Sequence, residues 1–259
     1  MGMTGDGVND LLALKEADCS VAIASGSEAA RNVSHMVLRD SNFANMPQVV
    51  MEGRRVVNNI QKSSSLYLMK TLFSMLMSVL VLILQIRYPF EPRNLLLLEF
   101  AIIGMPSLFL AFQSNKNRLQ GRFMFNMLKS AVPSGLTLLL TFVALFIFAG
   151  RRPDIFGVAP GVKIAEIMAS GQFRSCSVLV VTFTGLTLLF KLCMPVDAYR
   201  MTVWSVAALL CVGLSAFIGS QFEIVPPSLI LTLLVIVIVE TSYILVTIIQ
   251  TGLSKIKVN

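Results

Sequence analysis

Six apolar segments, each about 20 residues long, constrain this 259-residue chain more than any other feature of its sequence. A helix of about 20 residues is long enough to cross the roughly 30 Å hydrocarbon core of a bilayer. Only 14% of the residues are charged, against about 25% in soluble domains, and 55% are hydrophobic. The pattern predicts a mainly α-helical, polytopic membrane protein and excludes a chain that is a water-soluble globule as a whole.

The first apolar segment is the second half of a longer predicted helix over 47–84. At about 1.5 Å per residue this helix is roughly 57 Å long, so about half of it must lie outside the hydrocarbon. Its first half carries the polar and charged residues, which predicts a stalk helix over 46–64 and a six-helix transmembrane domain over 65–250. The other five membrane spans are predicted near 94–113, 130–149, 176–195, 202–220 and 227–249.

The basic residues predict the orientation of these spans. Six spans place both termini on the same side of the membrane, and that side then holds fourteen Lys and Arg residues against six on the other. Because basic residues are enriched in cytoplasmic loops, both termini are predicted to be cytoplasmic, with residues 251–259 as a cytoplasmic tail. Basic residues in loops on the cytoplasmic side of the lipid bilayer therefore account for the net charge of +7. No basic stretch is interleaved with aromatic residues, so we expect no nucleic acid as a partner.

The first 45 residues have a different pattern. The end of a strand, a turn and a short helix come first, and further strands are predicted at 20–24 and 36–38, with a helix that starts at Ser27. Alternation of strands and helices on this scale predicts part of a parallel α/β sheet. Because a parallel sheet needs cover on both faces, residues 1–45 are expected to be the C-terminal fragment of a larger cytoplasmic domain.

The segment MTGDGVND carries the residues best suited to chemistry in this region. Gly5 and Gly7 allow a tight turn around Asp6, and Asp10 adds a second carboxylate at the carboxyl end of the first strand. Open α/β sheets bind ligands at this end, and carboxylate oxygens are suited to Mg²⁺ held together with a phosphate. The alternative is purely structural: Asp6 in a turn, followed by Asn9 and Asp10 as helix-capping residues.

MTGDGVND, followed by LKEADCSVAIASGSEAARNVSHMVLRDSNF, resembles the end of the phosphorylation domain of P-type (E1–E2) cation-transporting ATPases. The six spans that follow are similar to the last six membrane helices of these pumps. The resemblance implies the C-terminal part of an α/β phosphorylation domain of the HAD-like (haloacid dehalogenase-like) fold. It also implies a cation-transporting enzyme of the plasma membrane, which uses ATP as substrate and Mg²⁺ as cofactor in the intact pump.

By the same resemblance, the catalytic residues of this chain are expected in the first loop. Asp6 would be a Mg²⁺ ligand at the phosphorylation site. Asn9 and Asp10 would help to hold the phosphate and the metal, and Thr4 and Gly5 would shape the loop.

Two motifs that the resemblance leads us to expect do not occur in the chain. The phosphorylated aspartate of the family lies in a DKTGT motif, and the dephosphorylating domain contains a TGE loop. We therefore expect the chain to be the C-terminal half of a pump, with the N-terminal half as its missing partner, and to be unable to hydrolyse ATP in isolation. The alternative is a free-standing, non-enzymatic six-helix membrane protein, such as a regulator or a channel-like remnant.

Three ionisable residues, Lys70, Glu99 and Glu240, fall within the predicted spans. Ionisable residues inside a bilayer are costly and are functional candidates by default. Each also has a structural alternative. Lys70 could extend to the cytoplasmic headgroups, Glu99 could face water at the outer end of its span, and Glu240 could form a hydrogen bond between helices.

Backbone and hydroxyl oxygens add to this candidate ion site. Lys70 and Ser74 share one helix face, and Pro106 has no N–H to donate to the carbonyl of Ile102. A carboxylate together with hydroxyls and a released carbonyl would form a site for a hard cation. The predicted ion-transport residues are Lys70, Thr71, Ser74, Glu99, the Ile102 carbonyl, Pro106 and Glu240.

The resemblance argues against transfer of calcium specificity. Thr71 and Ser74 stand where calcium-type pumps have Asn and Glu, and Glu99 stands where they have Asn. Lys70 occupies a position at which the gastric proton–potassium pump also has a lysine, which there resembles a built-in counter-cation. A fixed ammonium near Glu99 would replace one bound cation and weaken the binding of divalent ions.

Overall fold

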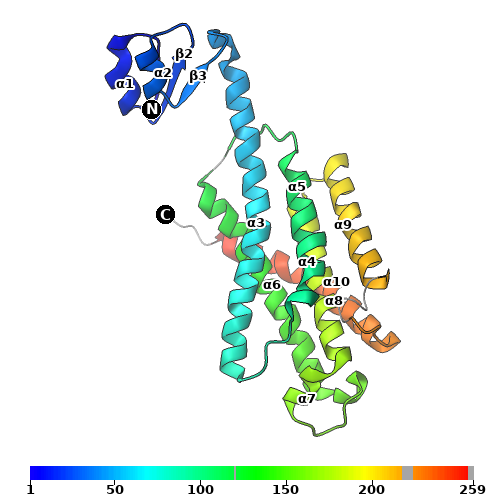
Figure 1. Ribbon diagram of the computed structural model, residues 1–259. Helices are drawn as coiled ribbons and strands as arrows, with labels where there is room; N and C mark the ends of the chain where they lie inside the picture. Colours follow the sequence, from blue (N-terminus) through cyan, green and yellow to red (C-terminus); the bar gives the residue numbers. More distant parts are fainter. Residues whose placement is uncertain (120, 218–223, 256–259) are drawn as a thin grey trace. The chain divides into compact units, whose positions relative to one another are not determined.

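Two units form the chain in the computed structural model, Met1–Arg54 and Arg55–Asn259 (Figure 1). The structure describes residues 1–119, 121–217 and 224–255. The boundary between the two units lies within helix α3, Met46–Leu84.

The first unit contains a three-stranded parallel sheet with the strand order β1-β2-β3. Gly5 of β1 lies beside Ala22 of β2, and Ile23 of β2 lies beside Leu38 of β3. The strands are β1 Gly2–Gly5, β2 Cys19–Ile23 and β3 Met36–Leu38, and the helices are α1 Leu11–Glu16 and α2 Glu28–Val33.

Local sequence explains these elements. The Ser27 hydroxyl accepts a hydrogen bond from the backbone N–H of Ala30 at 3.1 Å, which caps α2 at its predicted start. The core of this unit is small and consists of Leu14, Ala22 and Ala30, all fully buried. The predicted parallel sheet is confirmed, with its second strand one residue earlier than expected.

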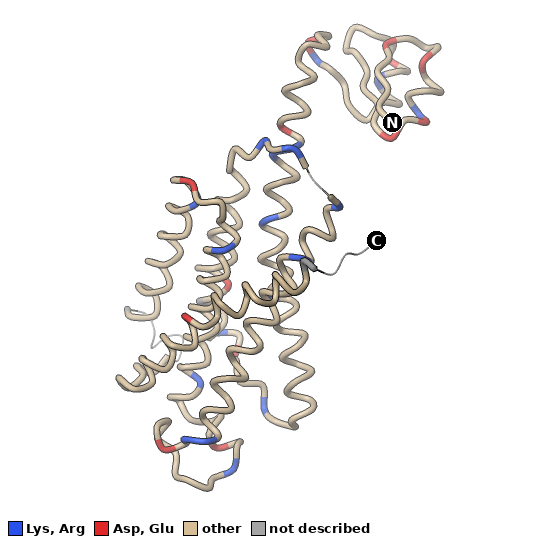
Figure 2. The backbone as a smooth tube through the Cα atoms, turned by 180° about the vertical axis from the view of Figure 1, so that it is seen from behind, with Lys and Arg blue, Asp and Glu red and all other residues tan. Residues whose placement is uncertain are grey.

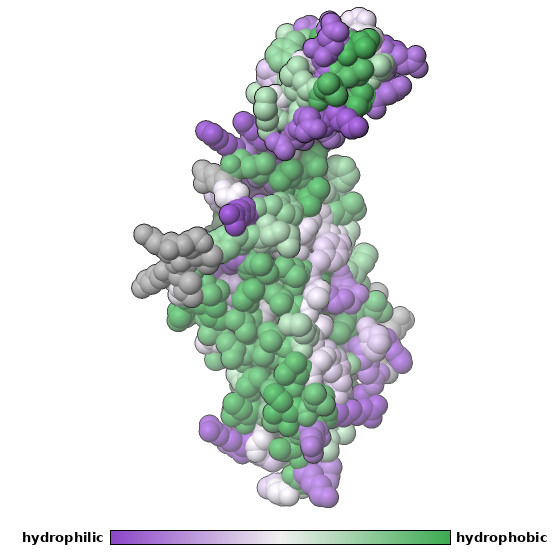
Figure 3. Space-filling model, turned by 90° about the vertical axis from the view of Figure 1, so that its left-hand side faces the viewer, coloured by the Kyte–Doolittle hydropathy of each residue, from purple (hydrophilic) through white to green (hydrophobic). Residues whose placement is uncertain are grey.

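In the second unit, six helical segments of the described chain are long and apolar enough to cross a membrane, which confirms the predicted fold class. Charged residues gather at the two ends of this bundle (Figure 2), and apolar side chains cover much of the surface between them (Figure 3). The segments are α3, α4–η3–α5 (Pro92–Leu98, Glu99–Gly104 and Met105–Ala111), α6 Phe123–Arg151, α8 Gly171–Leu192, α9 Ala198–Phe217 and α10 Leu229–Lys255; a short α7, Ile164–Ala169, precedes α8.

Helix α8 is the central helix of the bundle, because 67% of its apolar stretch is buried, against 22–47% for the other spans. Phe73, Phe90, Phe142 and Phe173 form a chain of ring contacts that ends on α8 at Phe173, with centroids 5.6–6.3 Å apart. Such tilted and edge-to-face contacts stabilise a packed core beyond the area that they bury.

The second span differs from an ordinary helix. We expected Pro106 to release the carbonyl of Ile102, and the structure contains a π-helical segment, η3, directly before Met105. The Met105 N–H donates to the carbonyl of Phe100, five residues earlier. Pro106 has no N–H to continue the regular pattern, so the helix accommodates it by widening the preceding turn.

The helices of the later spans also have bounds that differ from the prediction, α6 most of all. Helix α6 begins at Phe123 rather than near residue 130, because it continues through Pro133. The hydroxyl of Thr137 also donates to the Pro133 carbonyl at 2.8 Å, one turn further along the helix. The predicted ends at 218–220 and 256–259 lie outside the described residues.

Candidate functional site

The loop from β1 to α1 is folded around the carboxylate of Asp10. Oδ2 of Asp10 accepts hydrogen bonds from the backbone N–H of Asp6 at 3.3 Å and of Gly7 at 3.2 Å. A Cβ atom on Gly5 would lie 2.7 Å from the Cβ of Asp10. Gly5 is therefore needed because the Asp10 side chain lies directly on its backbone.

A second loop, from β2 to α2, holds the backbone of Asp6. The N–H of Ser27 donates to the Asp6 carbonyl at 2.7 Å, and a Cβ atom on Gly26 would lie 2.5 Å from the same oxygen. The Arg31 guanidinium donates to the carbonyls of Ala24 and Gly26 at 2.6 and 3.0 Å. The loops that follow two adjacent parallel strands are thus fastened together at the carboxyl edge of the sheet.

Sequence reasoning did not name Gly26 as a site residue. A signal was nevertheless present, because the Gly-Ser pair at 26–27 directly follows a strand and precedes a helix. In a parallel sheet this position lies at the same edge as the loop after the neighbouring strand.

The side chains of Thr4, Asp6 and Asn9 are exposed at this edge. In the part of the chain that the structure describes, the Asp6 carboxylate has no hydrogen-bond or ion-pair partner, whereas Asp10 uses one oxygen for two N–H groups. No group of three or more His, Cys, Asp and Glu residues that could hold a metal occurs among the described residues. Carboxylate oxygens such as those of Asp6 are donors of the kind that Mg²⁺ prefers.

In the second unit, Lys70 and Glu99 form an ion pair between α3 and the π-helical segment. Lys70 Nζ contacts Oε1 of Glu99, and the two side chains are 31% and 43% exposed. Both residues lie in candidate membrane spans, where an isolated charge is costly and a partner of opposite charge offsets that cost. Among the predicted ion-transport residues, these two are brought into contact.

The hydroxyl groups predicted on the first of these two spans make hydrogen bonds to residues other than Lys70 and Glu99. The Thr71 hydroxyl donates to the Tyr67 carbonyl at 3.0 Å, and Ser74 is hydrogen-bonded to the side chain of Tyr88. Tyr88 is in the loop after α3, where burial raises its pKa and the bond from Ser74 partly opposes that rise.

The side chains of Ile102 and Pro106 are both buried. Ile102 packs against α8, because a Cβ atom on Gly185 would lie 3.3 Å from its Cγ2. Sequence reasoning assigned a role to the carbonyl of Ile102, which belongs to the π-helical segment.

Glu240 lies on α10 and is exposed. It lines an apolar pocket of about 260 Å³ with residues of α8 and α10, including Leu179, Phe183 and Val235. Neither Lys70 nor Glu99 lines this pocket. The structure therefore does not bring Glu240 into the environment of the ion pair.

A chain of hydroxyl groups that we did not predict from the sequence joins α3 to α5, on the face of α3 that also carries Lys70. The Tyr67 hydroxyl is 3.1 Å from Oγ of Ser107, which donates to the Gly104 carbonyl at 2.9 Å, and Ser63 donates to the Ser107 carbonyl at 3.1 Å. The spacing of Ser63, Tyr67 and Lys70 by four and three residues places them on one helix face, which was the available signal.

Curated relatives of the chain are cation-transporting ATPases. The probable cation-transporting ATPase exp7 of Streptococcus pneumoniae is 33% identical over 232 residues, which cover 86% of this chain and 28% of that protein. The calcium-transporting ATPase CtpE of Mycolicibacterium smegmatis is 40% identical over 164 residues, 59% of this chain and 21% of the relative. The human potassium-transporting ATPase alpha chain 2 is 33% identical over 123 residues, 47% of this chain and 12% of the relative.

No protein-family model matches the chain. The chain spans 12–28% of the length of these three relatives. The similarity extends over both units, since it covers 86% of the chain in the streptococcal relative. The homologues of this chain are therefore cation-transporting P-type ATPases, each matched over only part of its length.

Proposed function

We propose that the chain acts in ATP-driven transport of an inorganic cation across the plasma membrane, as the C-terminal half of a P-type pump. The ion pair of Lys70 and Glu99 between two candidate spans is the observation that carries this proposal. The names of the relatives support the class of activity, and the six apolar helices support the membrane location.

In this proposal, the loop of residues 4–10 serves the phosphoryl chemistry. The free and exposed carboxylate of Asp6 would bind Mg²⁺, and Asn9 would contact the phosphate beside it. Asp10 would keep the loop in shape through its bonds to the N–H groups of Asp6 and Gly7, with its second oxygen left for the metal. Bound Mg²⁺ would neutralise charge on the phosphoryl group that the pump receives from ATP.

The ion pair also bears on which cation is transported. Because the Lys70 ammonium already neutralises Glu99, a divalent ion would have to displace it or share one carboxylate with it. We therefore propose a monovalent cation or a proton rather than Ca²⁺. Five further candidates remain for this site: Thr71, Ser74, the Ile102 carbonyl, Pro106 and Glu240. Each would have to contact the bound cation in addition to the contacts that it makes in the structure.

The orientation follows from the same proposal. The phosphoryl loop must meet cytoplasmic ATP, which places the N-terminal unit in the cytoplasm. With six spans the C-terminus would lie on the same side, in agreement with fourteen basic residues there against six on the other side.

The test uses native membranes and an antibody against the segment from Lys255 to Asn259. Membranes are incubated with radiolabelled ATP and Mg²⁺, and the protein that the antibody captures is examined for size and for a hydroxylamine-sensitive acyl phosphate. We expect a labelled band far above 28.4 kDa, whose labelling responds to monovalent cations or pH. An unlabelled band at 28.4 kDa would instead support the free-standing membrane protein.

A paired variant tests the ion site in the intact pump. With Glu99→Gln, we expect phosphorylation to lose its dependence on the transported cation while it still occurs. With Asp6→Asn, we expect phosphorylation itself to be lost. Unchanged cation dependence in the Glu99 variant would contradict the proposed ion site and leave the phosphoryl site intact.

A further inference from the structure

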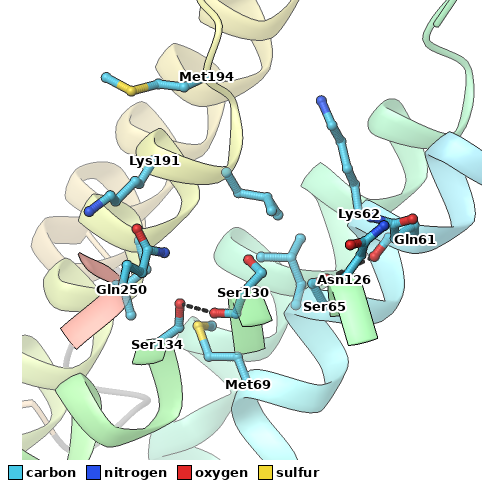
Figure 4. A pocket seen from close by; sticks show the side chains of 13 residues that line it. Gln61, Lys62, Ser65, Met69, Asn126, Ser130, Ser134, Lys191, Met194 and Gln250 are labelled. Carbon is cyan, nitrogen blue, oxygen red and sulfur yellow. Dashed lines mark hydrogen bonds between the residues drawn. The ribbon is translucent and has the colours of Figure 1, made fainter. Parts of the chain in front are cut away.

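A polar cavity of about 250 Å³ lies among α3, α6, α8 and α10, apart from the ion pair (Figure 4). Asn126 and Ser130 line it near the start of α6, Lys191 near the end of α8 and Gln250 near the end of α10. Because three helices have an end here, the cavity belongs to one end of the bundle. For a membrane-spanning bundle this is the level of the lipid headgroups.

The charges that line this cavity are all positive. Lys62 on α3 and Lys191 on α8 both contribute, and none of its lining residues is Asp or Glu. A neighbouring cavity of about 500 Å³ shares Gln61, Asn126, Ser130 and Gln250 and adds Lys129, again without a carboxylate. The two cavities therefore form one basic recess with three lysines.

Neutral donors accompany the lysines. Figure 4 shows Gln250 near Lys191 on one side of the cavity, and Gln61 and Asn126 beside the stem of Lys62 on the other, with the Lys62 ammonium extending away from both amides. Lys191 is positioned by its bond to the Thr247 hydroxyl at 2.7 Å and by the ring of Tyr243, 5.5 Å from Nζ. Lys62 has no hydrogen-bond or ion-pair partner in the part of the chain that the structure describes.

The rest of the lining is apolar. Leu66, Met69, Leu188, Leu192 and Met194 form this part of the wall. A recess with ammonium and amide donors on an apolar base matches a phosphate group attached to a hydrocarbon chain. Basic pockets between transmembrane helices bind anionic lipid headgroups for this physical reason.

We propose that this recess binds a phosphate-bearing anion, with Lys62 and Lys191 as the charged donors. An anionic phospholipid and free phosphate share this chemistry, and the experiment must distinguish the two sources.

The test measures binding to the full 259-residue chain in a mild, uncharged detergent. Short-chain phosphatidylglycerol, phosphatidylcholine of equal chain length and inorganic phosphate are titrated separately, and binding is read by native mass spectrometry. We expect phosphatidylglycerol to bind at least about tenfold more tightly than phosphatidylcholine, because only the former carries net negative charge.

Lysine variants locate the site. We expect Lys62→Gln and Lys191→Gln each to weaken phosphatidylglycerol binding about fivefold, and the double variant roughly 25-fold. Lys116→Gln and Lys163→Gln are the charge-matched controls, since both lysines are exposed and neither lines the recess. If a glutamine variant does not fold, Lys62→Arg and Lys191→Arg test the same site, and these must retain the binding of the unaltered chain.

Each outcome decides the proposal. Equal binding of phosphatidylglycerol and phosphatidylcholine, or unchanged affinity in the double variant, would overturn it. Binding of inorganic phosphate as tight as that of phosphatidylglycerol, with the same loss in the lysine variants, would uphold the phosphate site and assign it to free phosphate. Much tighter binding of phosphatidylglycerol would uphold the site and assign it to lipid.

Discussion

The two candidate sites hold a carboxylate by different means. In the loop after β1, two backbone N–H groups donate to Asp10, and the loop takes its shape from backbone contacts at Gly5 and Gly26. In the membrane unit, a side-chain ammonium, that of Lys70, holds Glu99. A backbone site depends on the absence of side chains around it, whereas an ion pair depends on both partners being present.

The largest effect is expected where a side chain enters the backbone site. In Gly26→Ala, the new Cβ would lie 2.5 Å from the Asp6 carbonyl oxygen, so one of the two loops must move. We expect the bond from Ser27 N–H to Asp6 to be lost and the unfolding free energy of the first unit to fall by roughly 2–4 kcal/mol. Hydrogen exchange of residues 1–45 in the full chain measures this change.

Gly53→Ala is the control for that experiment. Gly53 lies in α3, is exposed and has no atom within 4 Å of an added Cβ. Alanine in a helix is favoured over glycine, so we expect a gain of about 0.5–1 kcal/mol. Equal exchange behaviour in the two variants would contradict the close contact at Gly26.

The next largest effect is expected from breaking the ion pair. Lys70→Met leaves the Glu99 carboxylate without its counter-charge, and Glu99→Gln leaves the ammonium of Lys70. Full burial would make each loss larger, but both side chains are partly exposed, so we expect a loss of roughly 1–3 kcal/mol for each single change. Unfolding in detergent, followed by circular dichroism, measures it.

The double variant, Lys70→Met with Glu99→Gln, completes this comparison. Removal of both charges leaves none uncompensated, so we expect it to lose less than the sum of the two single changes, by about 1–2 kcal/mol. Strict additivity would show that the two side chains do not interact in solution.

Elements with a strong periodic pattern could be predicted from the sequence, and irregular backbone could not. The strand at 36–38 and the long helix at 46–84 were expected within one residue, because apolar spacing determines them locally. The π-helical turn at 99–104 was not expected as such. A proline and a glycine indicate that a helix is disturbed, but the packing around it decides how the backbone adapts.

The same distinction applies to the site residues. Asp6, Asp10, Lys70 and Glu99 were predicted as candidates because their residue types are unusual at these positions. Gly26 was missed because its role depends on a neighbouring loop that only the sheet brings close. Thr71 was predicted to belong to the ion site, and its hydroxyl bonds to its own helix.

A smaller effect is expected from glycines between helices of the membrane unit. A Cβ atom on Gly135 of α6 would lie 3.0 Å from the Cβ of Leu72 and 3.2 Å from the Met69 carbonyl of α3. We expect Gly135→Ala to separate α6 from α3 and to cost about 1–2 kcal/mol. Gly150→Ala, on the same helix with no atom within 4 Å, is the control and should be neutral or stabilising. Equal melting temperatures of the two variants would contradict close packing here.

The smallest effect is expected from an ion pair of the same kind outside the membrane spans. Arg152 and Asp154 are in contact at 3.0 Å, and both are well exposed. The hydrogen bond from the Arg152 guanidinium lowers the pKa of Asp154 below its ordinary value of 3.8. A depressed pKa in the folded state stabilises the fold above the ordinary value, and this contribution is lost as the pH falls through the lowered pKa.

Arg152→Gln should therefore lower the melting temperature slightly at neutral pH and have no effect in strong acid, where Asp154 is protonated in every state. Water and salt screen this pair, so its loss should be well below that of Lys70→Met. The measurement is the difference in melting temperature between variant and unaltered chain, followed from neutral pH to well below 3.8. If Arg152→Gln were as destabilising as Lys70→Met at neutral pH, the membrane setting would not explain the strength of the Lys70–Glu99 pair.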